Sequence, residues 1–136
     1  MNSEKKMKRA IEISMALKST CQTGRSFHCS FAWKKNKIVS IGYNSYKHEN
    51  LNHVFGEYKP TRGDSGNYKA GRHSETQMLR KLKMPTKDLT ICNVRIDNNN
   101  KVAMARCCPN CQKLLDSLGY RRILYSINEK EFGTIY

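Results

Sequence analysis

Two short motifs in this chain of 136 residues combine side chains that bind metals and move protons. The first is His73-x-Glu75, and the second, Cys108-x-x-Cys111, begins 35 residues after the first. Thiolate sulfur and imidazole nitrogen are preferred zinc ligands, and a neighbouring carboxylate can act as a general acid and base. Either motif alone is weak, but both fall where the sequence predicts the start of a helix. Their order and placement therefore predict one site.

The cysteine pair is predicted to open a helix. Cys108 stands at the N-cap position, and Pro109, which favours the first helical position, follows it. Both sulfurs would then lie near the positive end of the helix dipole, which favours the thiolate form that a metal needs. Cys107 directly precedes the pair. The spacing favours Cys108 with Cys111 as the ligand pair. Whether Cys107 is a fourth ligand, which would leave no position for water, stays an open question.

The candidate ligands His73, Cys108 and Cys111 number three, whereas zinc usually takes four. A fourth position that water fills is typical of catalytic rather than structural zinc. Zinc lowers the pKa of a bound water to about 7, and Glu75 could take the proton of that water and deliver it to a leaving amine. This combination of groups indicates hydrolytic deamination.

The two motifs together resemble the signature of the cytidine/deoxycytidylate deaminase superfamily. Similarity to its deoxycytidylate-type members extends to IVSIGYNS (38–45), GRHSETQML (71–79) and CCPNCQKLLDSLGYRRILYS (107–126). The chain departs from the family pattern at Cys107, where proline is usual, and at Ser74, where many members have alanine. The connection between the last two strands is short, as in the short cytidine deaminases.

This resemblance implies an activity and a set of roles. The activity is that of a zinc-dependent hydrolase acting on an amidine C–N bond, which converts cytosine to uracil in a (deoxy)cytidine nucleotide or nucleoside. Zn²⁺ would be held by His73, Cys108 and Cys111, with Glu75 as the proton shuttle. Asn44 would contact the sugar or base of the substrate, and the backbone at Ser74 would help recognise the pyrimidine. The resemblance also allows a homo-oligomer.

The rest of the sequence predicts the elements that position these motifs. Helices are predicted at 3–19, 73–83 and 109–118, strands at 28–33, 38–43, 89–96, 122–127 and 132–136, a short extended return at 101–105, and a long active-site loop at about 45–72. We expect a single domain, 1–136, of the α/β class. It would have the three-layer cytidine-deaminase-like fold, with a five-stranded mixed sheet flanked by helices and an antiparallel hairpin at the C-terminus.

The composition is that of a globular domain, because 38% of the residues are hydrophobic and only three are proline. No run approaches the roughly 18 apolar residues of a membrane span, and no apolar signal segment follows the basic residues at 5–9. We therefore expect a cytoplasmic protein with no membrane partner. Its six cysteines would be reduced there.

The charge balance of the chain bears on the type of substrate. The chain carries 25 Lys and Arg against 11 Asp and Glu, a net charge of +14, which indicates a partner that bears phosphate. The basic residues are spread along the whole chain, which favours a free nucleotide over a nucleic-acid strand. Candidate phosphate contacts are Arg25, Lys47, Arg62 and Arg72.

Two alternatives stay open. The first is a deaminase that acts on cytosine or adenine in single-stranded DNA or RNA. In that case basic residues would form a track along which the strand binds. The second is a non-catalytic structural zinc module. It would need a fourth protein ligand, with Cys107, Cys92 and His28 as candidates, and it would give Glu75 no role.

Overall fold

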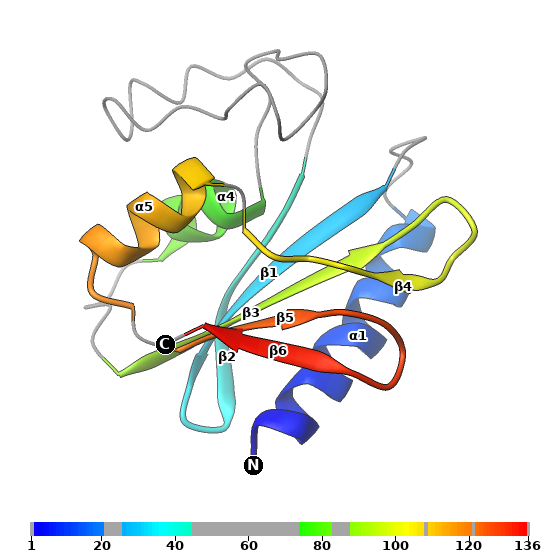
Figure 1. Cartoon of the computed structure of the whole chain (residues 1–136), viewed down its shortest axis with the longest axis horizontal. Coiled ribbons are helices and arrows are strands. Elements are labelled where there is room, and N and C mark those ends of the chain that lie inside the picture. Colours follow the sequence, from blue (N-terminus) through cyan, green and yellow to red (C-terminus); the bar gives the residue numbers. More distant parts are fainter. Residues whose placement is uncertain are drawn as a thin grey trace.

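The computed structural model describes residues 2–20, 26–44, 74–82, 88–107, 109–120 and 122–135 (Figure 1). The predicted loop at about 45–72 lies outside these ranges, and so do His73, Cys108 and the four candidate phosphate contacts. Within the described residues the helices are α1 (Ser3–Thr20), α4 (Ser74–Lys81) and α5 (Pro109–Ser117). The strands are β1 (Phe27–Lys34), β2 (Lys37–Tyr43), β3 (Leu89–Ile96), β4 (Val102–Ala103), β5 (Ile123–Ser126) and β6 (Phe132–Ile135).

The strands form one sheet in the order β2-β1-β3-β5-β6. β3 and β5 are parallel, and the other neighbours in this order are antiparallel, which confirms the predicted mixed sheet. The helix α5 makes the connection that parallel neighbours require. The last two strands, β5 and β6, are the antiparallel hairpin that the short connection predicted.

The sheet has helices on both faces, as the three-layer prediction required, and β1 contributes to both cores. Phe27, Cys29, Phe31 and Trp33 belong to the cluster under α1, whereas Ala32 packs with residues of α4 and α5. The alternation follows from the pleat of a strand, in which successive side chains point to opposite faces. Figure 1 shows α1 on one side of the sheet and α4 and α5 together on the other. None of the described helices has the length and apolarity needed to cross a membrane.

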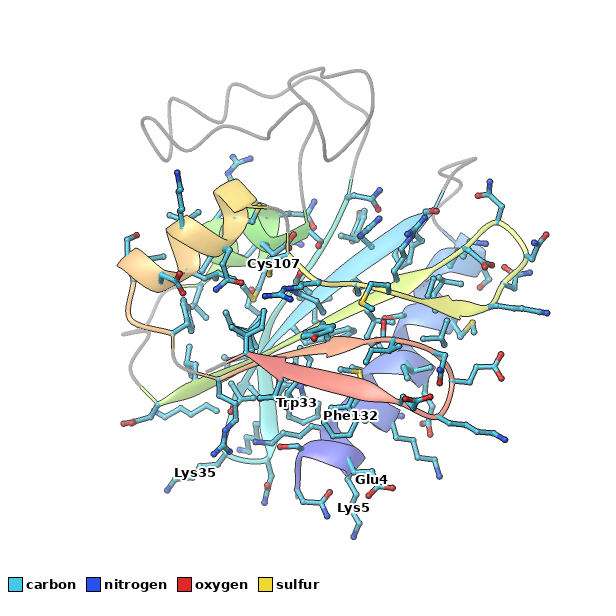
Figure 2. The ribbon with its side chains drawn as sticks, viewed as in Figure 1. Glu4, Lys5, Trp33, Lys35, Cys107 and Phe132 are labelled. Carbon is cyan, nitrogen blue, oxygen red and sulfur yellow. The ribbon has the colours of Figure 1, made fainter. Side chains whose placement is uncertain are left out.

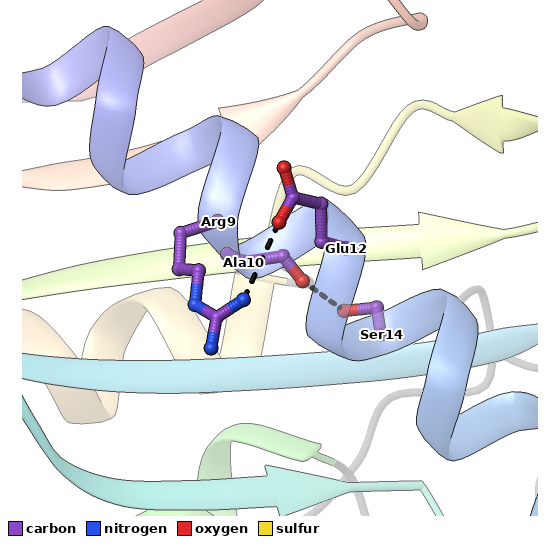
Figure 3. A network of polar contacts seen from close by, with 4 residues as sticks. All are labelled: Arg9, Ala10, Glu12 and Ser14. Carbon is purple, nitrogen blue, oxygen red and sulfur yellow. Dashed lines mark hydrogen bonds and ion pairs between the residues drawn. The ribbon is translucent and has the colours of Figure 1, made fainter.

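The first helix shows how a polar residue is accommodated on a buried face. Ser14 is 0% exposed, and its Oγ donates to the backbone oxygen of Ala10 one turn earlier, at 2.8 Å (Figure 3). On the exposed side, Arg9 Nη1 lies 3.3 Å from Glu12 Oε2. An exposed pair at this spacing contributes little to stability. The apolar face of α1 therefore holds the helix to the sheet.

The segment before α5 is less regular than predicted. An extended return was expected at 101–105, but β4 pairs with β3 over only two residues, Val102 and Ala103. Beyond that point the chain leaves β3, because the backbone nitrogen of Ala105 donates to the backbone oxygen of Ser126 in β5 at 2.9 Å. The strand is shortened because its partner changes, and the change directs the chain toward α5.

The end of α5 is as predicted. Gly119 has a φ of +85°, a left-handed conformation that glycine adopts readily. The backbone nitrogen of Tyr120 then donates to the backbone oxygen of Leu115 at 3.1 Å, which is the bond of a helix-terminating Schellman turn. The chain can therefore reverse sharply and enter β5.

Candidate active site

The side of the sheet that faces α4 and α5 carries three rows of residues, and each row crosses β2, β1 and β3. The first row is Ser40, Ala32 and Ile91, the middle row is Gly42, Ser30 and Asn93, and the outer row is Asn44, His28 and Arg95. Residues two apart in a strand share a face, so the rows follow one another along the strands. Ser40 is the polar residue of the first row, and the other polar residues of these rows lie in the middle and outer rows.

The helix α4 lies directly on the middle row at Gly42. A Cβ at this position would overlap the backbone nitrogen of Met78 and the backbone oxygen of Ser74, so the close approach requires glycine. One turn along the helix, Ser40 Oγ donates to the backbone oxygen of Met78 at 2.7 Å. The close contact at Gly42 sets the first turn of α4 against β2, and the bond from Ser40 anchors the next turn.

A chain of hydrogen-bonding side chains, buried except at its Cys107 end, runs from that first turn across the middle row to the start of α5. Ser74 Oγ lies 3.0 Å from Glu75 Oε1 and 2.8 Å from Ser30 Oγ, and its single proton serves one of these two contacts at a time. Ser30 Oγ donates to Asn93 Oδ1 (2.6 Å), and Asn93 Nδ2 donates to Cys107 Sγ (2.9 Å). We call these five residues the site network. It connects Glu75 of the first motif to Cys107, the residue directly before the second motif.

Glu75 lies in the first turn of α4 and is 7% exposed. No cation of the described residues lies within ion-pair distance of its carboxylate. The position favours a carboxylate because the first turn is the positive end of the helix dipole. Its neighbour Ser74 has a hydroxyl that can donate to the ionised carboxylate or accept from the protonated one. This arrangement suits a residue that must both take up and release a proton.

Two described cysteines lie at the start of α5, namely Cys111 of the second motif and Cys107, which directly precedes that motif. Cys111 is in the first turn and is 4% exposed. Cys107 precedes the helix, where Figure 2 labels it, and packs against the cluster that α4 and α5 share. Its sulfur accepts the hydrogen bond from Asn93. The structure thus gives Cys107 a contact within the site network.

The predicted zinc site extends beyond the described residues, since His73 and Cys108 lie outside them. Among the side chains that are described, no group of three or more potential ligands comes together. The residue types fit zinc, because two thiolates and one imidazole are a common ligand set for a catalytic ion. Cys111, the described member of the set, is buried at a helix start, as the sequence predicted. The zinc site itself stays a prediction.

One candidate for a fourth ligand is placed on the wrong side of the sheet. Cys92 belongs to the cluster under α1, together with Phe31 and Trp33, whereas Glu75 belongs to α4, which packs on the opposite face. Burial raises the pKa of the Cys92 thiol to about 12. A thiol that is protonated at neutral pH is a poor metal ligand. This finding excludes one of the three candidates for the fourth ligand of a structural zinc module.

Asn44 is fixed at the end of β2 by its own side chain. Its Oδ1 accepts from the backbone nitrogen of His28 (2.9 Å), and its Nδ2 donates to the backbone oxygen of Ser26 (3.1 Å). These bonds hold the carboxamide beside β1 in the outer row. Its predicted contact with the substrate stays a prediction.

Three polar residues of the middle and outer rows were not predicted from the sequence, namely Ser30, Asn93 and Arg95. The last two stand two residues apart in the otherwise apolar strand LTICNVRI. That spacing puts both on one face of a strand, and it was the available signal. Ser30 gave a weaker signal, because a single serine in a buried strand is common.

Arg95 is the cation of the outer row. Its Nη2 donates to Ser26 Oγ (3.1 Å), while its Nε is buried without a hydrogen-bond partner in the described part of the chain. No described carboxylate lies within ion-pair distance. A partly buried guanidinium without an anion is costly, so an anionic ligand on this face would offset that cost.

Comparisons with known proteins give the fold a name. No protein-family model matches the chain, and no curated protein matches its sequence. Two solved structures of the dCMP deaminase from the cyanophage S-TIM5 match its fold. The apo form is 14% identical with a TM-score of 0.54, over 93% of this chain and 86% of that one. The form in complex with dCMP and dUMP is 17% identical with a TM-score of 0.59, over 92% and 82%. The chain therefore has the cytidine/deoxycytidylate deaminase-like fold that the sequence predicted.

Proposed function

We propose that the chain is a zinc-dependent hydrolytic deaminase that converts the cytosine of a small nucleotide to uracil. The observation that carries this proposal is Glu75, a buried carboxylate without an ion-pair partner in the described residues, at the start of α4. A structural zinc module would have no use for such a group. The fold is shared with a protein that is named a dCMP deaminase, which supports the same reading.

The reaction replaces the exocyclic amino group of cytosine with the oxygen of water. A zinc ion held by His73, Cys108 and Cys111 would supply the Lewis acidity that activates water at neutral pH. Glu75 Oε would take one proton from that water and deliver it to the base. The oxygen of that water would form a bond to C4, Glu75 would assist transfer of a second proton to the amino group, and ammonia would leave when its bond to C4 breaks. The Ser74 hydroxyl, within hydrogen-bond distance, would donate to the carboxylate when it is ionised and accept from it when it is protonated.

The outer row supports a nucleotide as substrate. Arg95 brings a cation without a described carboxylate partner to the row that also holds Asn44 and His28. A guanidinium binds phosphate through several donors at once. The solved complex with dCMP and dUMP is of a protein with the same fold. We therefore propose a cytidine or deoxycytidine monophosphate.

A polynucleotide substrate is the second candidate, and the net charge of +14 favours it. A strand would bring many phosphates, so the activity would fall steeply with added salt. A single phosphate would give a much weaker dependence.

A substrate panel tests both candidates. Zinc-loaded protein is incubated with cytidine, deoxycytidine, their monophosphates, AMP, and single-stranded DNA and RNA, and ammonia release is measured at two salt concentrations. We expect release from CMP or dCMP, and none from the variant Glu75→Gln. Activity only on strands would replace the first candidate with the second. No release from any substrate by fully loaded protein would refute the deaminase proposal.

A further inference from the structure

The site network joins the first turn of α4 to the start of α5 through two residues of the sheet that belong to neither motif. We propose that these two residues, Ser30 and Asn93, are positioning residues that set Glu75 and the cysteine segment relative to one another. The proposal rests on the proposed function, since it concerns the geometry of the same site.

Ser30 is the link to the carboxylate. It lies in the interior of β1, is 0% exposed, and contacts Ser74 Oγ at 2.8 Å and Asn93 Oδ1 at 2.6 Å. A buried hydroxyl without such partners would carry a large desolvation cost. Because Ser74 Oγ also lies 3.0 Å from Glu75 Oε1, the rotamer of Ser74 and the place of the carboxylate depend on Ser30.

Asn93 is the link to the cysteines. It stands directly opposite Ser30 in the antiparallel pair of β1 and β3 and is 3% exposed. Its Oδ1 is bound to Ser30, and its Nδ2 is bound to Cys107 Sγ at 2.9 Å. Cys107 is the residue before the predicted ligand Cys108. The carboxamide of Asn93, on the central strand β3, therefore bridges the two halves of the site.

The anchoring of α4 to the sheet is a separate task that another serine performs. Ser40 Oγ donates to the backbone oxygen of Met78 at 2.7 Å, and Ser40 is 7% exposed. It is thus a buried serine of the same sheet face that holds the same helix, but it has no bond within the site network. Comparing variants of Ser30 and Ser40 therefore separates a loss of positioning at the site from a general loss of stability.

Supporting residues of this kind change rate and metal retention more than substrate binding. Residues that orient metal ligands typically alter metal affinity or activity by about 10- to 100-fold. A misplacement of about 1 Å in a catalytic group can cost about 100-fold in rate. We therefore expect Ser30 and Asn93 to act on kcat and on zinc release, with little change in KM.

The experiment compares Ser30→Ala and Asn93→Ala with the control Ser40→Ala. Four quantities are measured for each: Tm, kcat and KM on the active substrate, the rate of zinc release to a chromogenic chelator, and the absorption spectrum of the Co²⁺-substituted protein. For the first two variants we expect kcat to fall about 10- to 100-fold with KM within about 3-fold. Zinc release from Asn93→Ala should be about 10-fold faster, with an altered Co²⁺ spectrum.

The control should lose Tm to a similar degree while kcat, zinc release and the Co²⁺ spectrum stay close to those of the wild type. Ser30→Thr, which keeps the hydroxyl and suits a strand, should restore most of kcat. If Asn93→Ala does not fold, Asn93→Thr is measured in the same way. Equal effects of Ser30→Ala and Ser40→Ala on kcat at equal loss of Tm would overturn the proposal.

The two proposals can fail separately. A wild-type protein that deaminates nothing refutes the proposed function, yet zinc release and the Co²⁺ spectrum still decide the role of the network. Faster release from Asn93→Ala than from Ser40→Ala sustains the positioning role, and equal release overturns it.

Discussion

Gly42 and Met78 are in contact through their backbones, because β2 and α4 approach so closely that a Cβ on Gly42 would lie 2.8 Å from Met78 Cα. The same Cβ would also overlap the backbone oxygen of Ser74. None of these atoms can move without moving the helix. We predict that Gly42→Ala displaces the first turn of α4 and with it Glu75. Overpacking of this kind costs about 1–3 kcal/mol, and activity should fall by more than the loss of folded protein explains.

The matched control is Gly119→Ala. Gly119 has a positive φ of 85° but open space around its Cβ position. Its replacement should cost about 1 kcal/mol through backbone strain after the C-terminal end of α5, the opposite end of the helix from Cys111. Tm and kcat of both variants are compared. Full specific activity in soluble Gly42→Ala protein would contradict the close-contact argument.

Glu75→Gln tests the proton shuttle without emptying the site. Glutamine has nearly the same shape and can still contact Ser74, so the fold and the zinc content should be kept. Loss of a general acid and base should lower kcat by about 100- to 10,000-fold. Zinc is measured by metal analysis and stability by thermal unfolding. Unchanged activity would exclude Glu75 as the shuttle.

Cys111 allows a complementary prediction about the metal. It is 4% exposed in the first turn of α5, where a thiolate could reach a bound ion. Cys111→Ser should bind less than the full complement of zinc, and a strong chelator should inactivate the wild type reversibly on zinc return. Full zinc content in Cys111→Ser protein would contradict the predicted ligand set.

The sequence predicted the fold well because its signals were local. The apolar spacing in α1, the aromatic and β-branched residues of β1 and β2, and the glycine after α5 each indicated an element within a few residues. The sequence predicted the residues of the two motifs but not Ser30 and Asn93, the sheet residues that contact the site. The pairing of Ser30 with Asn93 joins strands 63 positions apart, and the register of a sheet is set by long-range packing that no local pattern contains.

Arg95 offers a test of the phosphate in the substrate. We predict that Arg95→Ala raises KM for the nucleoside monophosphate about 10- to 100-fold, since hydrogen bonds to charged groups contribute about 1.5–3 kcal/mol. The activity on the nucleoside should hardly change. Lys37→Ala controls for the loss of one positive charge, because Lys37 is exposed at the other end of β2 from Asn44. An equal effect of Arg95→Ala on nucleotide and nucleoside would exclude a phosphate contact.

The turn between β3 and β4 predicts a pH dependence of stability. The Asp97 Oδ1 accepts from the backbone nitrogens of Lys101 and Asn99, both at 2.9 Å. These bonds, the one from Lys101 foremost, and the nearby charges of Lys101 and Lys18 hold the pKa of the Asp97 carboxyl below its usual 3.8. A carboxyl whose pKa is lower in the folded protein stabilises the fold above the unfolded pKa, and that contribution is lost as the pH falls through the folded pKa.

Asp97→Asn keeps an acceptor oxygen but removes the charge, and a neutral acceptor binds N–H groups more weakly. We therefore expect Asp97→Asn to have a lower Tm than the wild type near neutral pH. The difference should shrink as the pH falls below 3.8, where the carboxyl of the wild type also becomes neutral. It should largely persist in high salt, because its first cause is a short hydrogen bond rather than a distant charge. Thermal unfolding at a series of pH values measures this, and a Tm difference that is constant across the series would contradict the ionised carboxylate as the source of the stability.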